Sequence, residues 1–289
     1  MPEVAVVSDT TAYLPRDTVE DEGIHIVSLY VNYGGDRTEQ EVGMADFNAF
    51  YDELRSVEEL PTTSQPSVGD FVATYAPLLD RGLSVVSVHV SGGLSGTCDS
   101  ARQAAEGLRR DGRGGERVSV IDSETTAGGL GLLALAAARR AQAGDAAEEI
   151  VEHVANARSE MKMWFAVDTL EYLKRSGRVG AASAWIGSTL KVKPILTVER
   201  EIAPVERVRT SARAYERMVD YARQRQASGA DAWTVQHIQA PDEARRLTER
   251  CREIFSTEPA FVSELGPIVG VHAGPGLIGV GALPSRYLA

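Results

Sequence analysis

The chain has 289 residues, of which 43% are hydrophobic and 25% charged, and it carries a formal net charge of −11. This length and composition are typical of a folded protein with room for two cores. The acidic balance argues against nucleic-acid binding, and the lack of an apolar run of roughly 20 residues argues against membrane insertion.

Strands and helices alternate along the first 158 residues. Strands are predicted where short runs of β-branched residues occur, and helices where apolar residues recur every three or four positions. The expected elements are strand 4–7, strand 24–31, helix 44–54, helix 68–79 capped by Ser67, strand 83–90, helix 99–110, strand 118–121, and helix 130–142 ending at Gly144. This alternation favours a mostly parallel, Rossmann-like sheet in an N-terminal α/β domain, residues 1–158.

The pattern changes after residue 158 and predicts a second α/β domain with a mixed sheet, residues 159–289. A helix is expected in TLEYLKRSGRVG (169–180), with a break at Gly177. The other expected elements are strand 163–167, a short helix over 181–190, a hairpin of strands 193–198 and 202–208, helix 212–226, strand 233–238, helix 240–255 and strand 260–265, and a segment rich in glycine follows from residue 269.

The segment VVSVHVSGGLSGT (85–97) combines a buried strand, a loop of small and hydroxyl residues, and the start of a helix. The first N–H groups of a helix have no partner within it, so such a loop suits an anion. Ser91, Ser95 and Thr97 add hydroxyl groups. The loop has neither the lysine of a Walker loop nor the second glycine of a nucleophile elbow.

Two further segments and one histidine are candidates for the same site. SDTTAYLP (8–15) follows the first strand, and PTTSQPS (61–67) carries four hydroxyls and two prolines. SDTTAYLP is equally typical of a turn that caps the next helix, and for PTTSQPS a helix cap with a rigid linker is the plainer interpretation. His272 stands beside a glycine- and proline-rich segment, where the plainer interpretation is a histidine in a surface loop. His89, within a predicted strand, is expected to be a hydrogen-bonded core residue.

The whole pattern resembles the DegV family of bacterial fatty-acid-binding proteins. The resemblance covers nearly the whole chain and depends on eight segments in order: VSDTTAYLP, PTTSQPS, HVSGGLSGTCDSA, VIDSETTAGGLG, TLEYLKRSGRVG, LKVKPILTVE, VRTSARA and HAGPG. It implies two α/β domains with a non-covalently bound long-chain fatty acid held between or beneath them, and with the acyl chain in an apolar tunnel of the N-terminal domain. Matching the motifs implies that the carboxylate is held by Thr63, Ser64, Ser95, the Gly96 amide and His272.

The resemblance also implies a partner, because some members carry the acyl group for a bacterial fatty acid kinase. In those members a separate kinase subunit phosphorylates the bound carboxylate, and arginines near the cavity mouth help it dock. The matching candidates are Arg175, Arg178 and Arg209, although solvated helix ends explain these basic clusters equally well. No cofactor and no enzymatic activity of the chain itself are implied.

Two other functions are open on the sequence alone. A serine hydrolase or acyltransferase would use Ser95 and His272, with Asp122 or Asp168 orienting the histidine. Nucleotide binding at the glycine- and serine-rich loop would lack the lysine and metal-binding carboxylates of phosphoryl transfer. Cys98 and Cys251 have no metal-site spacing, and the N-terminal residues lack the features of a signal peptide, so a cytoplasmic location is expected.

Overall fold

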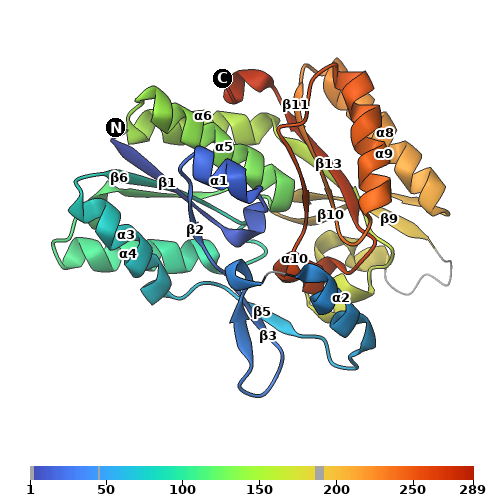
Figure 1. The fold of residues 1–289 in the computed structure, drawn as a ribbon, viewed down its shortest axis with the longest axis horizontal. Coiled ribbons are helices and arrows are strands. Elements are labelled where there is room, and N and C mark those ends of the chain that lie inside the picture. Colours follow the sequence, from blue (N-terminus) through green and yellow to red (C-terminus); the bar gives the residue numbers. More distant parts are fainter. Residues whose placement is uncertain (1–2, 45, 186–191) are drawn as a thin grey trace.

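A computed structural model of the protein describes residues 3–44, 46–185 and 192–289. One half contains a parallel sheet of strand order β2-β1-β6-β7 (Figure 1). Helices α3 and α4 pack together on one face of this sheet, and α5 and α6 on the other. The elements are β1 (Val4–Asp9), α1 (Arg16–Asp21), β2 (His25–Val27), α3 (Val68–Asp80), β6 (Ser84–His89), α4 (Thr97–Arg110), β7 (Val118–Asp122), α5 (Ala127–Ala143) and α6 (Ala147–Glu160).

The other half contains a mixed sheet of order β10-β9-β8-β13-β11-β12, in which β11 and β12 are parallel and the other neighbours antiparallel. Helices α8 and α9 cover its outer face. Its elements are β8 (Lys162–Ala166), β9 (Lys193–Glu199), β10 (Glu201–Val208), α8 (Ser211–Ala227), β11 (Ala232–His237), α9 (Pro241–Phe255), β12 (Phe261–Glu264) and β13 (Ile278–Leu283).

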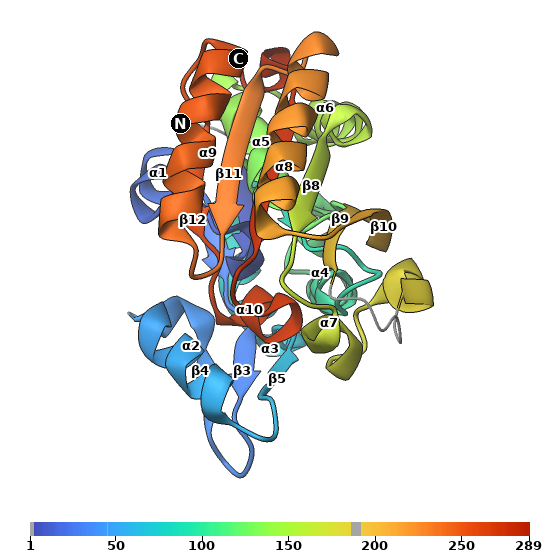
Figure 2. The same ribbon diagram turned by 90° about the vertical axis from the view of Figure 1, so that its right-hand side faces the viewer.

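A smaller layer lies against α10, as Figure 2 shows. It contains an antiparallel sheet of order β4-β3-β5 together with α2, and α10 contacts α2, α7, β3 and β5. The elements are β3 (Tyr30–Asn32), β4 (Thr38–Gln40), α2 (Phe47–Ser56), β5 (Thr62–Ser64), α7 (Glu171–Arg175) and α10 (Pro267–Ala273). Single 3₁₀ turns are η1 (Thr10–Ala12), η2 (Glu41–Gly43), η3 (Gly115–Arg117), η4 (Gly180–Trp185) and η5 (Ser285–Tyr287).

Helix α5 lies between the two larger sheets and contacts strands of both. It is buried without interruption from Ala127 to Ala138, which explains why its sequence is alanine, leucine and glycine on every side. A Cβ atom at Gly131 would lie 2.6 Å from the Phe261 ring, so glycine lets β12 approach the helix. Because α5 packs against both halves, the division into domains 1–158 and 159–289 stays a prediction.

Most predicted elements are confirmed, including the β9–β10 hairpin. Ser67 caps α3 in a capping box, and Gly144 ends α5 with φ of +94°. The single strand expected over 24–31 is wrong. Residues 25–27 and 30–32 pair in different sheets, because residues 28 and 29 leave the strand and the Leu29 N–H donates to Thr10 Oγ1 at 3.2 Å.

Three further expectations are corrected. PTTSQPS is not all loop, because Thr62–Ser64 pairs with β3. No helix or strand was expected in the glycine-rich segment from residue 269, but it contains the end of α10 and, after a turn at residues 275–276, strand β13, which lies between β8 and β11. The expected helix over 181–190 is a 3₁₀ turn up to Trp185, and its remaining residues lie outside the described part of the chain.

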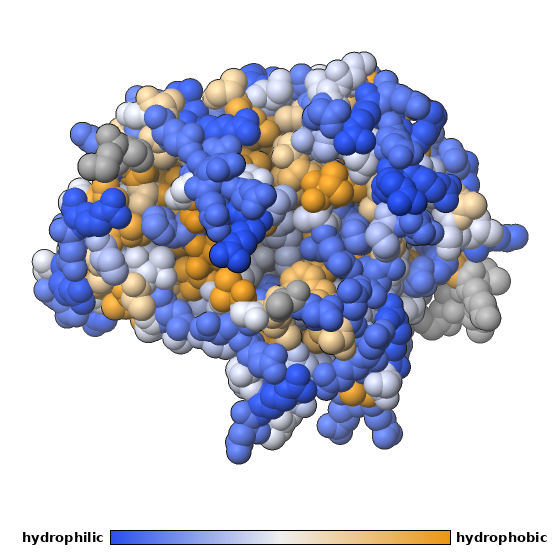
Figure 3. All heavy atoms as spheres, viewed as in Figure 1, coloured by the Kyte–Doolittle hydropathy of each residue, from blue (hydrophilic) through white to orange (hydrophobic). Residues whose placement is uncertain are grey.

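The surface of the molecule is largely hydrophilic on the face drawn in Figure 3, with hydrophobic residues in separate patches. In the described ranges, no helix combines the length and the apolar character that crossing a bilayer requires.

Candidate functional site

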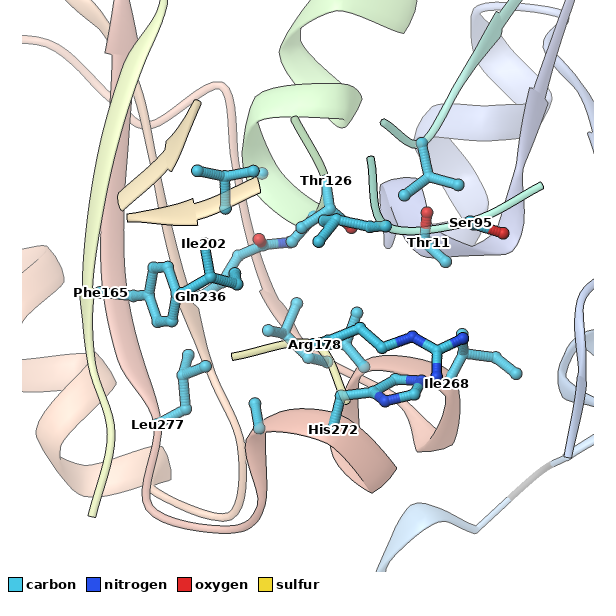
Figure 4. A pocket seen from close by; sticks show the side chains of 18 of the residues that line it. Thr11, Ser95, Thr126, Phe165, Arg178, Ile202, Gln236, Ile268, His272 and Leu277 are labelled. Atoms are coloured by element: carbon cyan, nitrogen blue, oxygen red, sulfur yellow. The ribbon is translucent and has the colours of Figure 1, made fainter. Parts of the chain in front are cut away.

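A cavity lies where the loops after β1 and β6, the start of α5, the mixed sheet and α10 meet (Figure 4). Loops at the carboxyl ends of parallel strands commonly form binding sites. The apolar wall comes mainly from the mixed sheet, with residues that include Met163, Phe165, Val198, Ile202 and Val280. Both halves of the chain line this cavity, as expected for a ligand held between the two domains, and the placement of the acyl chain in the N-terminal domain stays a prediction.

Thr63 and His272 meet at the polar end of the cavity. Thr63 Oγ1, on β5, lies 2.8 Å from His272 Nε2, on α10. Burial, together with the nearby charge of Arg178, lowers the pKa of His272 to about 4, so the imidazole is neutral at pH 7. Its Nδ1 atom is buried without a hydrogen-bond partner. Thr62, the neighbouring threonine of the same motif, is exposed and does not line the cavity.

Helix α10 is held in place by a buried carboxylate. Glu41 Oε1 accepts hydrogen bonds from the Ile268 N–H and from the Tyr13 hydroxyl, both at 2.8 Å. The Tyr51 hydroxyl donates to the Leu265 carbonyl at 2.7 Å, just before the helix. Burial raises the pKa of Glu41 to about 7. These contacts fix the helix that carries His272.

Ser95 and Gly96 lie at the start of α4 and line the cavity. Ser95 Oγ is 2.8 Å from Thr97 Oγ1 and accepts from the Thr97 N–H at 3.3 Å. Ser91 does not take part, because its hydroxyl donates to the Arg200 carbonyl at 2.5 Å. The anion loop predicted from the sequence is therefore only partly available to a ligand.

The three candidate arginines occupy different positions. All three are exposed, but Arg178 lines the cavity beside His272, as Figure 4 shows, whereas Arg175 and Arg209 are absent from the lining. Arg175 Nη2 donates to the Glu58 carbonyl at 2.6 Å. Among the described residues that line the cavity, Arg178 is the only cation and no side chain is acidic. The site therefore favours an anion.

Five other polar residues line the cavity. Thr11, Gln65 and Thr126 lie in motifs quoted above but were not named as site residues, and Thr234 and Gln236 lie in a predicted strand. A Cβ atom at Gly96 would lie 2.8 Å from Gln65 Nε2, so the amide side chain packs against the loop that carries Ser95. A signal existed for Gln236, which is a polar residue within a strand that is otherwise typical of a core. Ser64 lines the cavity as predicted, with Asn32 Nδ2 3.4 Å from its hydroxyl.

The hydrogen bonds do not form the triad of a serine hydrolase. Ser95 and His272 bond to Thr97 and Thr63 rather than to each other. Asp122 accepts from the Glu124 N–H of its own loop and from the Gly92 N–H of the loop after β6, and Asp168 pairs with Lys193 Nζ at 2.5 Å.

His89 is a satisfied core histidine, as predicted. It is fully buried, between Ser87 Oγ at 2.6 Å and Asp9 Oδ2 at 3.0 Å. It lies within β6 and takes no part in the cavity lining.

Comparisons of the sequence with known proteins find relatives that all carry the same family name. The sequence model of the DegV family matches residues 3–285. A DegV domain-containing protein of Streptomyces coelicolor is 39% identical over 280 residues, covering 96% of this chain and 97% of the relative. Protein DegV of Bacillus subtilis is 33% identical over 282 residues, covering 96% and 98%.

Solved structures have the same fold. A DegV family protein from Thermus thermophilus, described by its fatty acid binding, superimposes with a TM-score of 0.86 at 31% identity, covering 98% of this chain and 100% of the other. DegV from Bacillus subtilis, described as a fatty acid binding protein, gives a TM-score of 0.86 at 33% identity, covering 98% and 99%.

Proposed function

The chain belongs to the DegV family, and from this premise we propose that it binds one long-chain fatty acid without covalent chemistry. The observation that carries the proposal is the cavity itself. Its wall is mainly apolar, and its polar end holds a neutral threonine–histidine pair, one arginine and no acidic side chain among the described lining residues. The descriptions of the two solved relatives support the same ligand class.

The polar end offers several donors to a carboxylate. With the His272 proton on Nε2 and directed to Thr63 Oγ1, the Thr63 hydroxyl is free to donate to the ligand. Ser95 Oγ, the Gly96 N–H and Arg178 line the same end, with Ser64 beside Thr63. A buried carboxylate costs several kcal/mol to desolvate, and charge-assisted hydrogen bonds of this kind offset that cost.

The acyl chain supplies most of the affinity. Each methylene that leaves water contributes about 0.8 kcal/mol, and the apolar residues of the mixed sheet and α10 surround it. No step of the proposal breaks or forms a covalent bond on this chain, so we propose a binding protein rather than an enzyme.

Mass spectrometry of the purified protein tests the proposal. A native spectrum with one long-chain fatty acid per chain, and a denatured spectrum at the mass of the bare polypeptide, would support non-covalent binding. A covalent acyl adduct on Ser95 would instead support an acyl-transfer enzyme. Protein that is empty and takes up no added fatty acid would contradict the function.

We further propose that the bound acid is presented to a separate kinase subunit that forms the acyl phosphate. Arg175 and Arg209 are exposed and outside the cavity lining, so they are the docking candidates, whereas Arg178 serves the carboxylate. Arg209→Glu should leave fatty-acid binding unchanged and lower the yield of acyl phosphate with a kinase subunit. Loss of fatty-acid binding in this variant would contradict the docking role.

A further inference from the structure

A second polar group faces the cavity from the mixed sheet. Gln236, on β11, is 3% exposed and lines the cavity in Figure 4. Its Nε2 atom donates to Ser263 Oγ at 2.9 Å, but its Oε1 atom is buried without a hydrogen-bond partner. Leaving such an atom unpaired costs about 1–3 kcal/mol, and a ligand that bonds to it would remove this cost.

The start of α5 lies against this amide. A Cβ atom at Gly128 would be 2.9 Å from Gln236 Oε1. The absence of a side chain at this position therefore leaves room for the Gln236 amide. Thr126 precedes the helix and lines the cavity, and its side chain makes no capping hydrogen bond. The first N–H groups of a helix have no partner within it. The neighbouring Thr234 hydroxyl, in contrast, already donates to the Phe261 carbonyl at 2.9 Å.

A plain hydrocarbon chain gives these groups nothing to bond. A hydroxyl on the chain both donates and accepts, so it matches Gln236 whichever way the amide is turned, and it can also accept from Thr126. We propose that Gln236 and Thr126 form a hydroxyl-recognition site within the acyl cavity, and that the ligand class is a long-chain fatty acid with a hydroxyl group on its chain. This inference rests on the proposed function.

The test compares octadecanoic acid with its mid-chain and terminal hydroxy isomers in displacement titrations of the purified, delipidated chain. One neutral hydrogen bond predicts that at least one hydroxy isomer binds about three- to tenfold more tightly than octadecanoic acid. If octadecanoic acid binds and every hydroxy isomer binds equally or more weakly, the inference is overturned while the proposed function stands. If no fatty acid binds, the proposed function itself fails.

Substitutions assign the preference to the amide. Gln236→Met keeps the length of the side chain and removes its polar end, so the preference should fall to none or reverse. Gln224→Met makes the same change on the exposed side of α8 and should keep the preference. Thr126→Val gives a second variant, with a smaller loss, in case Gln236→Met folds poorly. A hydroxyl preference that survives in both cavity variants would refute the assignment.

Discussion

Replacing Thr63 by valine tests the carboxylate site most directly. Valine keeps the β-branched shape that suits strand β5 but removes the hydroxyl that lies 2.8 Å from His272 Nε2. The ligand loses one charge-assisted hydrogen bond, and His272 loses the partner that orients it. Such a bond contributes about 1.5–3 kcal/mol, which corresponds to roughly a tenfold to hundredfold rise in the dissociation constant.

A matched control lies one residue away on the same strand. Thr62 is exposed and is not part of the cavity lining, so Thr62→Val makes the same chemical change without touching the ligand. Titration of delipidated protein with octadecanoic acid measures both dissociation constants, and urea unfolding checks that the two variants are equally stable. Equal affinity of Thr63→Val and Thr62→Val would refute the assignment of Thr63 to the carboxylate.

Three other predictions concern the same region. Ser95→Ala should weaken fatty-acid binding by about 1.5–3 kcal/mol in the same titration, and unchanged affinity would remove Ser95 from the site. Arg178→Met should weaken binding of the fatty-acid anion and raise the pKa of His272, measured by NMR titration, because the positive charge that lowers it is gone. Glu41 has a folded-state pKa of about 7 against an ordinary 4.5, so its folded form holds a proton that the unfolded chain releases. The free energy of unfolding should therefore fall by up to about 3 kcal/mol as pH rises from 4.5 to 7, relative to Glu41→Gln, and parallel pH profiles of the two proteins would contradict this.

The polar residues that line the cavity could largely be predicted, because they lie in short polar motifs at the ends of strands. Thr63, Ser95 and His272 come from three such motifs, and the cavity lining includes all three. The sequence did not predict which motif residues the protein uses internally. Ser91, for example, has the same residue type as Ser95 but bonds to the Arg200 carbonyl, a contact between distant parts of the chain.

The errors have a common physical reason. Strand β13 was not predicted from its glycine-rich sequence, which includes Gly279 and Gly281, although glycine in a strand also marks a close approach of neighbours. A Cβ atom at Gly279 would lie 3.0 Å from the Phe165 side chain, so the glycines serve the packing of the cavity wall. The position of Gln236 beside Gly128 likewise depends on α5 packing against the mixed sheet, which no local pattern records.

The place of β13 has a consequence for synthesis of the protein. It is the last strand of its sheet along the chain, yet it pairs with β8 and β11 in the middle. Until residues 278–283 leave the ribosome, the strands on its two sides have no shared neighbour, and the apolar wall of the cavity stays open to water. Pairings this distant in sequence form slowly, so the nascent chain passes through a stage in which chaperones or aggregation compete for that surface.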